Sequence, residues 1–463
     1  MPEHLEAQRL ETQRLETELL VIGWGKGGKT LARSLGSAGR RVVLVERDDA
    51  MVGGTCINVA CVPTKALVHQ AESRRPDDHP DAFLARAVET RDSLVGRLRE
   101  ANRQLLATVD AVTLVRGEAR FTGPRTVRVH GGDEQLEIVA EHVVVNTGTE
   151  PRLPGIPGET GPRVHDSTGL QHLDRVPERL AIVGGGPIAL EFAGMFARFG
   201  SAVTVIVRGA SILPHEDDDV RASVEEALTD AGVRILADAD TERIDDDGAV
   251  ATVVTSAGEV AADAVLLATG RAPVTAGLDL PSAGIATDER GFVTVDELLR
   301  TSADGVWAVG DVNGGQQLTP ISLDDHRVVL SQLTGRGGRS RDDRVAVPTT
   351  TFTTPPLARV GITEREARAR GLDVRVAAKP VATIAAMPRP KAVGETHGII
   401  KLVVDAQSDL VLGAALHTID AQEVVNLVAL AMRAGVTATE LRDGIWTHPS
   451  STEALNEVLA ELR

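Results

Sequence analysis

Among its 463 residues the chain has only two cysteines and no tyrosine, and aromatic side chains make up 2% of it. This excludes a secreted domain held together by many disulfides. No apolar run reaches the roughly 18 residues of a membrane-spanning helix, and the N-terminus lacks the basic-then-apolar layout of a secretory signal. We therefore expect a cytoplasmic protein without a membrane partner.

Positive charge is also scarce, since the formal net charge is -17. Nucleic acid and anionic membranes bind to basic faces, so we expect neither as a partner. The apolar content of 42% excludes a disordered chain, and the length exceeds what one hydrophobic core holds. The composition indicates a metabolic enzyme of about three domains.

Both cysteines lie in one motif, Gly53-Gly54-Thr55-Cys56-Ile57-Asn58-Val59-Ala60-Cys61-Val62-Pro63-Thr64-Lys65. The four residues between Cys56 and Cys61 allow the sulfurs to lie about one helical turn apart, close enough for a small disulfide. Because so short a loop removes little chain entropy, such a bond is a redox group rather than a stabilising cross-link. Two buried structural cysteines are the alternative. The run through Gly54 and Thr55 favours a helix that opens beside an anionic cofactor.

A nucleotide-binding pattern precedes this motif. An apolar run at 19–22 leads into a glycine-rich turn, a helical pattern and a second apolar run that ends at Glu46. This order is the fingerprint of a dinucleotide-binding unit. Gly23, Gly25 and Gly28 are predicted to bind the cofactor, with Glu46 accepting hydrogen bonds from its adenosine ribose. A glycine turn that only packs is the alternative.

The same pattern occurs a second time. The residues from Gly184 match those from Gly23 without a gap, and Ala189 takes the third glycine position, where a small residue suffices. The count that leads from Gly23 to Glu46 leads from Gly184 to Val207, with Arg208 next. A missing acid beside a guanidinium predicts NADPH over NADH, although an isolated solvated arginine is the alternative. The predicted contacts of this second unit are Gly184, Gly186, Ile188, Glu191, Arg208 and, at its closing strand, Gly270.

The cysteine motif resembles the redox centre of the class I pyridine nucleotide-disulfide oxidoreductases, flavoproteins that include glutathione reductase, dihydrolipoamide dehydrogenase and mercuric reductase. The resemblance implies FAD stacked against Cys61, with Cys61 as the charge-transfer thiolate and Cys56 as the thiol that meets the substrate. It also implies that Lys65 lies at the reactive edge of the flavin and pairs with Glu191.

Three later stretches are similar to further motifs of this family. Thr147 and Gly148 end the strand that closes the first FAD segment. Gly310 and Asp311 belong to the distal FAD motif, in which the aspartate binds the ribityl chain, and Leu318 and Thr319 are implied to line the flavin through backbone groups. The stretch from Trp446 to Glu453 is similar to the C-terminal signature, which implies a homodimer with shared active sites. In it His448, oriented by Glu453, is the acid-base group for the other subunit's thiol.

The implied fold class is α/β, with two Rossmann-like three-layer nucleotide-binding domains, the second inserted in the first, and an α+β C-terminal dimerisation domain. Residues 1–17, whose leucines recur every five positions, are expected to form a frayed polar extension. The expected domains are an FAD-binding domain with the redox-active disulfide (18–153), an NAD(P)H-binding domain (154–275), the second part of the FAD-binding domain (276–345) and the dimerisation domain (346–463).

Closer local matches, such as Lys26-Gly27-Gly28-Lys29-Thr30 and Asp166-Ser167-Thr168-Gly169, resemble the bacterial flavoproteins of reactive-chlorine resistance that reduce cupric ions. This implies electron transfer from NADPH through FAD and the cysteine pair to Cu(II) or another thiophilic metal ion or oxidant-defence substrate. Cys56 and Cys61 would be transient metal ligands. The alternatives are a reductase of a small disulfide, a lipoamide dehydrogenase subunit and a low-turnover flavin redox sensor. Pro187 replaces the gating tyrosine of many relatives, which implies a more open nicotinamide site.

Overall fold

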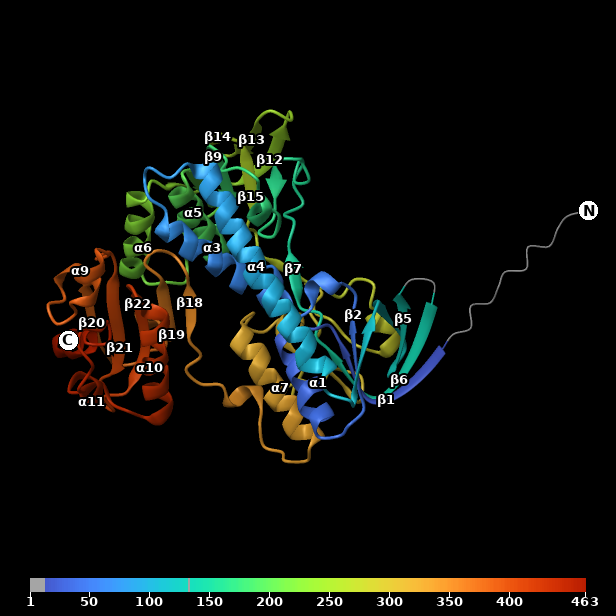
Figure 1. Ribbon diagram of the computed structural model, residues 1–463. Helices are drawn as coiled ribbons and strands as arrows, with labels where there is room; N and C mark the ends of the chain where they lie inside the picture. Colours follow the sequence, from blue (N-terminus) through green and yellow to red (C-terminus); the bar gives the residue numbers. More distant parts are fainter. Residues whose placement is uncertain (1–12, 132–133) are drawn as a thin grey trace, which may run out of the picture. The chain divides into compact units, whose positions relative to one another are not determined.

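The computed structural model describes residues 13–131 and 134–463. The chain forms two compact units, and each is assembled from separate segments of the sequence (Figure 1). Unit 1 consists of residues up to 64, 89–152 and 270–343, and unit 2 consists of 65–88, 153–269 and 344–463. Among the helices of the described residues, none has both the length and the apolar character needed to cross a membrane.

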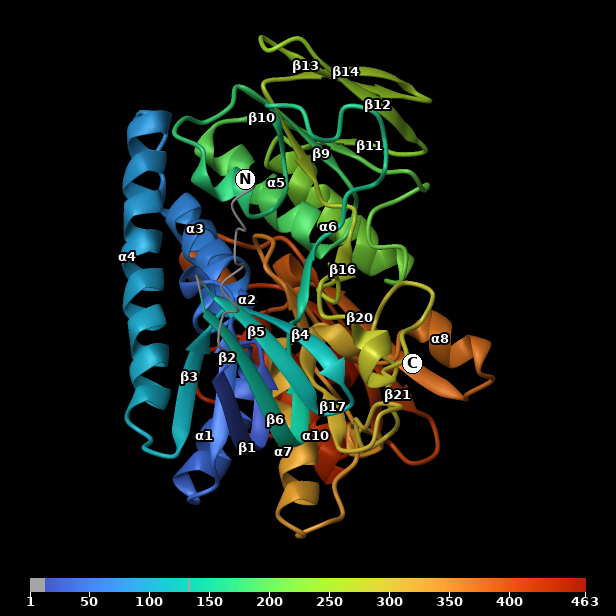
Figure 2. The ribbon, with the colours of Figure 1, turned by 90° about the vertical axis from the view of Figure 1, so that its right-hand side faces the viewer.

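Unit 1 is built on a sheet with the strand order β3-β2-β1-β6-β5-β4, and β17 pairs with β6. The strands are β1 (Gln13–Ile22), β2 (Val42–Glu46), β3 (Val112–Arg116), β4 (Glu118–Gly123), β5 (Thr126–Gly131), β6 (Glu134–Val145) and β17 (Val306–Ala308). β1, β2, β3, β6 and β17 pair in parallel, whereas β4 and β5 are antiparallel, and Figure 2 shows β4, β5 and β6 as neighbouring arrows. Helices α1 (Lys26–Ser37) and α7 (Thr319–Leu333) pack against each other. The apolar runs of β1, β2 and β6 are buried, as in parallel strands covered on both faces.

The predicted polar extension is partly wrong. Strand β1 begins at Gln13, and residues 13–17 pair with residues 136–140 of β6, while residues 1–12 lie outside the described part. The ladder to a partner more than a hundred positions away fixes this segment, whereas its own side chains lack the alternation of a strand.

The central part of unit 2 is a parallel sheet with the strand order β11-β10-β9-β15-β8. Its strands are β8 (Val164–His165), β9 (Arg179–Val183), β10 (Ala202–Ile206), β11 (Arg234–Leu236) and β15 (Ala264–Leu267). It is accompanied by α5 (Pro187–Phe199), α6 (Asp218–Asp230) and an antiparallel sheet of β12 (Thr241–Asp246), β13 (Ala251–Thr255) and β14 (Gly258–Ala262).

The two nucleotide units share the same backbone hydrogen bond at the glycine turn. The Gly23 N–H donates to the Val45 carbonyl at 2.8 Å, and the Gly184 N–H donates to the Ile206 carbonyl at 2.9 Å. In both units a helix begins directly after the second glycine of the fingerprint: α1 follows Gly25 and α5 follows Gly186. Pro187 is the first residue of α5, a position where proline is favoured. The gap-free match of the sequence is thus a match of backbone structure.

The C-terminal part of unit 2 is an antiparallel sheet with the strand order β18-β19-β22-β21-β20. Its elements are β18 (Thr349–Thr351), β19 (Leu357–Gly361), β20 (Val374–Pro380), β21 (Ile399–Asp405), β22 (Val411–His417), α8 (Glu364–Ala369), α9 (Arg389–Val393), α10 (Ala421–Ala434), α11 (Ala438–Arg442) and α12 (Ala454–Val458). Helix α10 packs on β19 and β22. This part has the α+β architecture that we expected.

The division of the chain differs from the expected domain ranges at residues 65–88. We placed them in the first part of the FAD-binding domain, but they group with unit 2. The reason is packing: Leu67 and Val68 of α3 (Cys61–Ser73) share a buried core with Phe192 and Phe196 of α5. Residues 80–88 open the long helix α4 (Pro80–Ala107), which continues into unit 1.

A buried lysine joins the two parts of unit 2. Lys401 of β21 is 4% exposed, and its Nζ lies 3.1 Å from Asp217, 2.9 Å from Asp219 and 2.8 Å from Glu364. Asp217 and Asp219 lie at the start of α6, and Glu364 opens α8. One cation therefore pairs with three carboxylates that come from two separate segments.

We expect Lys401→Met to lower the free energy of unfolding by about 3 kcal/mol, because it leaves uncompensated charges at a buried site. The hydrogen bond from Lys401 holds the pKa of Glu364 below its ordinary value. This contribution is present above the unfolded pKa and is lost as the pH falls, so the difference between native and variant should shrink below about pH 4. Urea midpoints measure it, with Arg243→Met, which breaks an exposed pair with Asp245, as the control.

Candidate active site

The two cysteines lie where one helix ends and the next begins. Cys56 is in α2 (Thr55–Asn58) and Cys61 opens α3, so Val59 and Ala60 interrupt the single helical turn that the spacing suggested. Both are thiols in this structure, and their side chains are hydrogen-bonded to each other. This hydrogen bond, and burial after it, raise the pKa of the Cys56 thiol.

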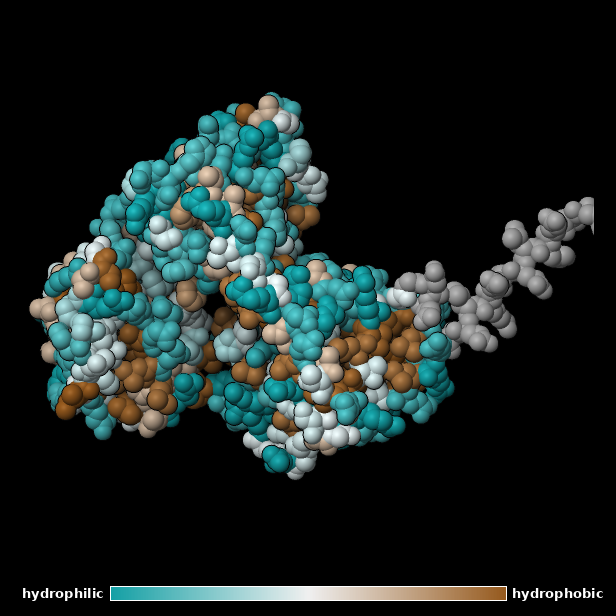
Figure 3. Space-filling view, in the orientation of Figure 1, coloured by the Kyte–Doolittle hydropathy of each residue, from teal (hydrophilic) through white to brown (hydrophobic). Residues whose placement is uncertain are grey.

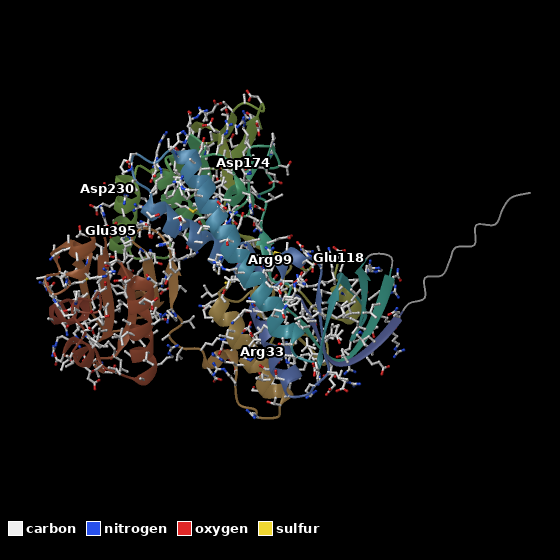
Figure 4. The ribbon with its side chains drawn as sticks, in the orientation of Figure 1. Arg33, Arg99, Glu118, Asp174, Asp230 and Glu395 are labelled. Carbon is white, nitrogen blue, oxygen red and sulfur yellow. The ribbon has the colours of Figure 1, made fainter. Side chains whose placement is uncertain are left out.

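The turn before Cys56 is held from several sides. Gly53 and Gly54 have φ values of +98° and +83°, a region that favours glycine. The Asn58 side-chain amide donates to the carbonyl groups of the residues on either side of Gly53, at 2.9 and 3.0 Å. Arg99 of α4, labelled in Figure 4, donates in turn to Asn58 at 2.9 Å. A Cβ on Gly54 would lie 2.7 Å from the Gly25 Cα, so the cysteine motif packs directly on the first fingerprint turn.

Thr319 contacts the cysteines through its side chain. Its Oγ1 lies 3.7 Å from the Cys61 Sγ, and its hydroxyl also hydrogen-bonds Cys56, where it opposes the rise in pKa. We expected Thr319 to line the flavin through backbone groups, so this contact adds a side-chain role. Thr319 begins α7, a helix of 15 residues that Leu318 precedes, and the positive end of its dipole favours a thiolate.

The first fingerprint fits a dinucleotide. A Cβ on Gly23 would lie 2.5 Å from the Asn146 carbonyl oxygen, and one on Gly28 would lie 2.6 Å from the Asn146 Oδ1, so only glycine permits this close approach. No side chain caps the N-terminus of α1, which leaves backbone N–H groups for a phosphate. Glu46 lies at the end of β2 beside this turn, accepts the Trp24 N–H at 3.0 Å, and has its pKa raised by burial.

The two separate FAD segments of the sequence meet in unit 1. Asn146, after β6, accepts the Gly28 N–H at 2.9 Å and donates to the Val309 carbonyl at 2.8 Å. The Thr149 hydroxyl donates to Asp311 at 3.2 Å, and burial raises the pKa of Asp311. Thr147 and Gly148 lie between these contacts, and Gly310 precedes Asp311. The predicted FAD residues from both segments are therefore close together.

The predicted pair of Lys65 and Glu191 is formed within unit 2. The Lys65 Nζ donates to Glu191 at 2.6 Å, and Glu191 is 6% exposed. The Phe352 N–H donates to the other carboxylate oxygen at 2.9 Å, and the Lys65 Nζ lies 5.0 Å from the centre of the Phe352 ring. Lys65 follows Cys61 by four positions in the sequence of α3.

The second fingerprint has the same close packing at its glycine turn, but it differs from the first at the position that corresponds to Glu46. A Cβ on Gly184 would lie 2.4 Å from the Ala268 carbonyl oxygen, and Gly186 caps α5 without a side-chain hydrogen bond. Val207 is buried and lies 3.1 Å from the place of a Cβ on Gly185, so a methyl group stands where Glu46 stands in unit 1. Arg208 is exposed beside it. Ile188 is half-buried in the first turn of α5, and Gly270, with φ +111°, follows β15.

His448 and Glu453 form the predicted pair near the C-terminus. The Nδ1 of His448 lies 2.9 Å from Glu453, whose other oxygen accepts the Ser450 N–H at 2.8 Å. Burial raises the pKa of Glu453, but the Ser450 N–H and His448 outweigh it, so the pKa is lowered. The His448 side chain is 71% exposed. A histidine fixed in orientation and open to solvent suits a group that serves another subunit.

Sequence reasoning missed two buried polar residues of this region. Asn146 and Lys29 are 5% and 4% exposed, and both hold the glycine-rich turns together. The internal repeat could have indicated that Lys29 is buried, because Lys29 corresponds in it to the apolar Leu190. No cluster of three or more metal-ligating side chains occurs within residues 13–131 and 134–463.

Two dinucleotide fingerprints and a dithiol define an oxidoreductase, and comparison with known proteins agrees. Residues 17–325 match the pyridine nucleotide-disulphide oxidoreductase family, and residues 347–459 match its dimerisation domain. The chain belongs to this family of homodimeric enzymes, which use FAD and NAD(P)H. The C-terminal part exposes Leu430 and Ile445 at 58% and 99%, and Figure 3 shows hydrophobic side chains on its surface.

Within the family the chain is of the RclA type. It is 45% identical over 444 residues to the probable pyridine nucleotide-disulfide oxidoreductase RclA of Escherichia coli (strain K12), which covers 96% of this chain and 98% of that protein. It is 32% identical over 452 residues to the mercuric reductase of Staphylococcus aureus, covering 95% of this chain and 81% of that protein. The structure of HOCl-induced flavoprotein disulfide reductase RclA from Escherichia coli in complex with Cu(II) matches with a TM-score of 0.92 and 44% identity, covering 96% of this chain and 99% of that one. The predicted family, fold class and enzyme class are confirmed.

Proposed function

We propose that this flavoprotein disulfide reductase passes electrons from NADPH, through FAD and the Cys56–Cys61 pair, to Cu(II) or another thiophilic metal ion. The observation that carries the proposal is the hydrogen bond between the two thiols. The motif that contains them packs on the first fingerprint turn. The RclA structure with Cu(II) and the mercuric reductase relative support a metal ion as acceptor. Thiolates are soft ligands that favour Cu(I), so Cys56 and Cys61 suit transient binding of the reduced metal.

Residues of both units have assignable roles in this path. Gly23, Gly25, Gly28, Glu46 and Asp311 would hold FAD. Bound FAD supplies two-electron transfer between NADPH and the disulfide, and the resulting dithiol holds the proton of the hydride and one from solvent. Lys65, paired with Glu191, would lie at the reactive edge of the flavin.

The dithiol would then reduce two metal ions and return to the disulfide. Two Cu(II) ions each accept one electron and become Cu(I), the Cys56–Cys61 disulfide forms, and two protons leave the thiols. His448 of the partner subunit, oriented by Glu453, would accept a proton from Cys56. The overall products are NADP+, two Cu(I) ions and one proton.

Anaerobic NADPH oxidation by the purified FAD-loaded dimer tests the proposal. We expect turnover with Cu(II), with Cu(I) captured by a chelator at two ions per NADPH. Glutathione disulfide, mycothiol disulfide and lipoamide serve as competing acceptors. Turnover with lipoamide alone would identify a lipoamide dehydrogenase and contradict the proposal, and no turnover with any acceptor would favour a redox sensor.

The preference for NADPH follows from Val207 and Arg208. A carboxylate at position 207 would repel the 2′-phosphate of NADPH, whereas the exposed guanidinium of Arg208 can pair with it. A charge-assisted pair contributes about 1.5 to 3 kcal/mol, so kcat/KM for NADPH should exceed that for NADH by roughly tenfold to a hundredfold. The double variant Val207→Glu with Arg208→Ala should reverse this ratio, while Arg243→Ala, which removes an arginine from another sheet, should not. Equal use of both cofactors by the native enzyme would defeat the argument.

A further inference from the structure

The two nucleotide units differ at one buried position beside the glycine turn. The Asn146 N–H donates to the Ile22 carbonyl at 2.8 Å. The Ala268 N–H makes the same bond in the second unit, to the Val183 carbonyl at 2.9 Å, so Ala268 takes the place of Asn146 there. Asn146 is 5% exposed, and a buried amide is costly unless it is hydrogen-bonded. An amide at a place where alanine suffices for the fold indicates a role other than packing.

The facing helix changes together with this residue. A Cβ on Gly28 of α1 would lie 2.6 Å from the Asn146 Oδ1, so the first unit has no side chain at that helix position. In the second unit Ala189 takes the place of Gly28. The second unit therefore has two methyl groups where the first has a glycine and an amide.

Both ends of the Asn146 amide are bound. Its Oδ1 accepts the Gly28 N–H at 2.9 Å, and its Nδ2 donates to the Val309 carbonyl at 2.8 Å. These partners fix the orientation of the amide, because an N–H only donates and a carbonyl only accepts. Val309 directly precedes Gly310 and Asp311. The amide thus joins the turn that would hold the FAD phosphates to the loop that carries the ribityl aspartate.

Helix α7 adds a second connection between the same two segments. The Gly27 N–H donates to the Ser322 Oγ at 3.0 Å, and Asp325 accepts the Gly310 N–H at 2.6 Å. A Cβ on Gly310 would lie 2.8 Å from the Ser322 Oγ and 3.1 Å from the Asn146 Nδ2. Both connections therefore meet at Gly310, and all of these groups belong to unit 1.

These connections also decide which N–H groups at the start of α1 are free. Side chains bind the N–H groups of Gly27 and Gly28. Within the described residues, the N–H groups of Gly25 and Lys26 have no hydrogen-bond partner and remain for a phosphate. Ala268 has no polar side-chain atom, so the second unit cannot form the connection that Asn146 makes.

We propose that Asn146 is a positioning residue that locks the FAD cradle, so that FAD is retained from one turnover to the next. A site whose parts are already fixed orders fewer groups on binding, and such differences in affinity lie mostly in the dissociation rate. FAD must stay bound while the oxidised nicotinamide dinucleotide must leave. The amide in the first unit and the alanine in the second match these two tasks.

The test measures FAD release from the FAD-loaded dimer without any electron acceptor. Flavin is quantified in the ultrafiltrate at successive times after dilution, and calorimetry gives the dissociation constants of NADP+ and NAD+. The variants are Asn146→Ala, the isosteric Asn146→Asp, and Asn146→Ala with Gly28→Ala, which recreates the pair of the second unit. Asn456→Ala is the matched control, because the Asn456 amide also donates to two backbone carbonyls, at 2.6 and 2.9 Å, but lies in the C-terminal part of unit 2.

We expect Asn146→Ala to release FAD about tenfold to a hundredfold faster than the native protein, because two buried hydrogen bonds are lost. Asn146→Asp keeps the volume and the acceptor for Gly28 but places an oxygen against the Val309 carbonyl, so its release should be at least as fast. The double variant should also release FAD fast. Asn456→Ala should release it at the native rate, and the affinity for the nicotinamide dinucleotides should be native in all variants.

Native release of FAD from Asn146→Ala or Asn146→Asp would overturn the proposal. So would recovery of slow release in the double variant, because filled volume rather than the amide would then retain FAD. A parallel loss of affinity for NADP+ and NAD+ would also overturn it, since that indicates loosening of the whole chain. No readout uses Cu(II), so failure of the proposed acceptor leaves the result intact.

Discussion

Replacing Cys56 by serine should lower Cu(II)-dependent NADPH oxidation by roughly a thousandfold or more, while the protein stays dimeric and retains yellow FAD. A hydroxyl is a far poorer nucleophile and electron donor than a thiolate, so the dithiol can no longer form or pass on electrons. FAD should stay bound, because the substitution exchanges one sulfur for an oxygen and leaves the glycines of the first fingerprint turn in place.

The measurement is anaerobic NADPH consumption with Cu(II), beside the stoichiometric bleaching of the flavin absorbance by NADPH alone. Ile57→Val, which changes the neighbouring residue of α2 and leaves the thiols in place, is the matched control and should keep native turnover. Full metal reductase activity in Cys56→Ser would show that the acceptor receives its electrons without the dithiol.

The second large effect concerns the sharing of active sites between subunits. His448→Ala alone should lower turnover by about a hundredfold to ten-thousandfold, the range for loss of an acid-base group. If His448 serves the cysteines of the other subunit, a heterodimer of Cys56→Ser and His448→Ala contains one complete site. Such a heterodimer, isolated with two different tags, should recover about half of native activity from two inactive parents.

A second heterodimer makes this test decisive. Native chain paired with a chain that carries both substitutions has no complete site if the sites are shared, but has one if each subunit works alone. The two heterodimers should therefore differ from each other by the same factor as His448→Ala differs from native. The exposure of the His448 side chain, its hydrogen bond to Glu453 and the 99% exposure of nearby Ile445 agree with a place at the subunit interface.

Local motifs made much of this site predictable from the sequence. The glycines of both fingerprints, the end of β2 at Glu46 and the repeat are properties of short segments whose geometry permits few residue types. The pairs Lys65–Glu191 and His448–Glu453 followed from resemblance alone, since nothing in the residues themselves indicates that Glu191 faces a lysine far away in the sequence.

What remained hidden depends on distant partners. Residues 13–17 are strand because β6 extends beside them, and Thr319 contacts sulfur through a side chain whose direction is set by the start of α7. Lys29 has the sequence pattern of an exposed helix residue, and only the packing of α4 and the cysteine turn buries it. Burial of a polar group is decided by the elements that cover it, which a single helix pattern does not contain.

The amide of Asn146 has a consequence for the order in which the protein assembles on the ribosome. It bridges Gly28 and Val309, and β6 completes its pairing only with β17, so the first nucleotide unit needs residues from nearly two-thirds of the chain. The inserted segment 153–269 is synthesised before β17 and contains its own parallel sheet. Contacts between residues so far apart close slowly, and chains of this size fold segment by segment. The nascent chain can therefore form its second nucleotide fold first, and it gains a finished FAD cradle only after residue 309 has emerged.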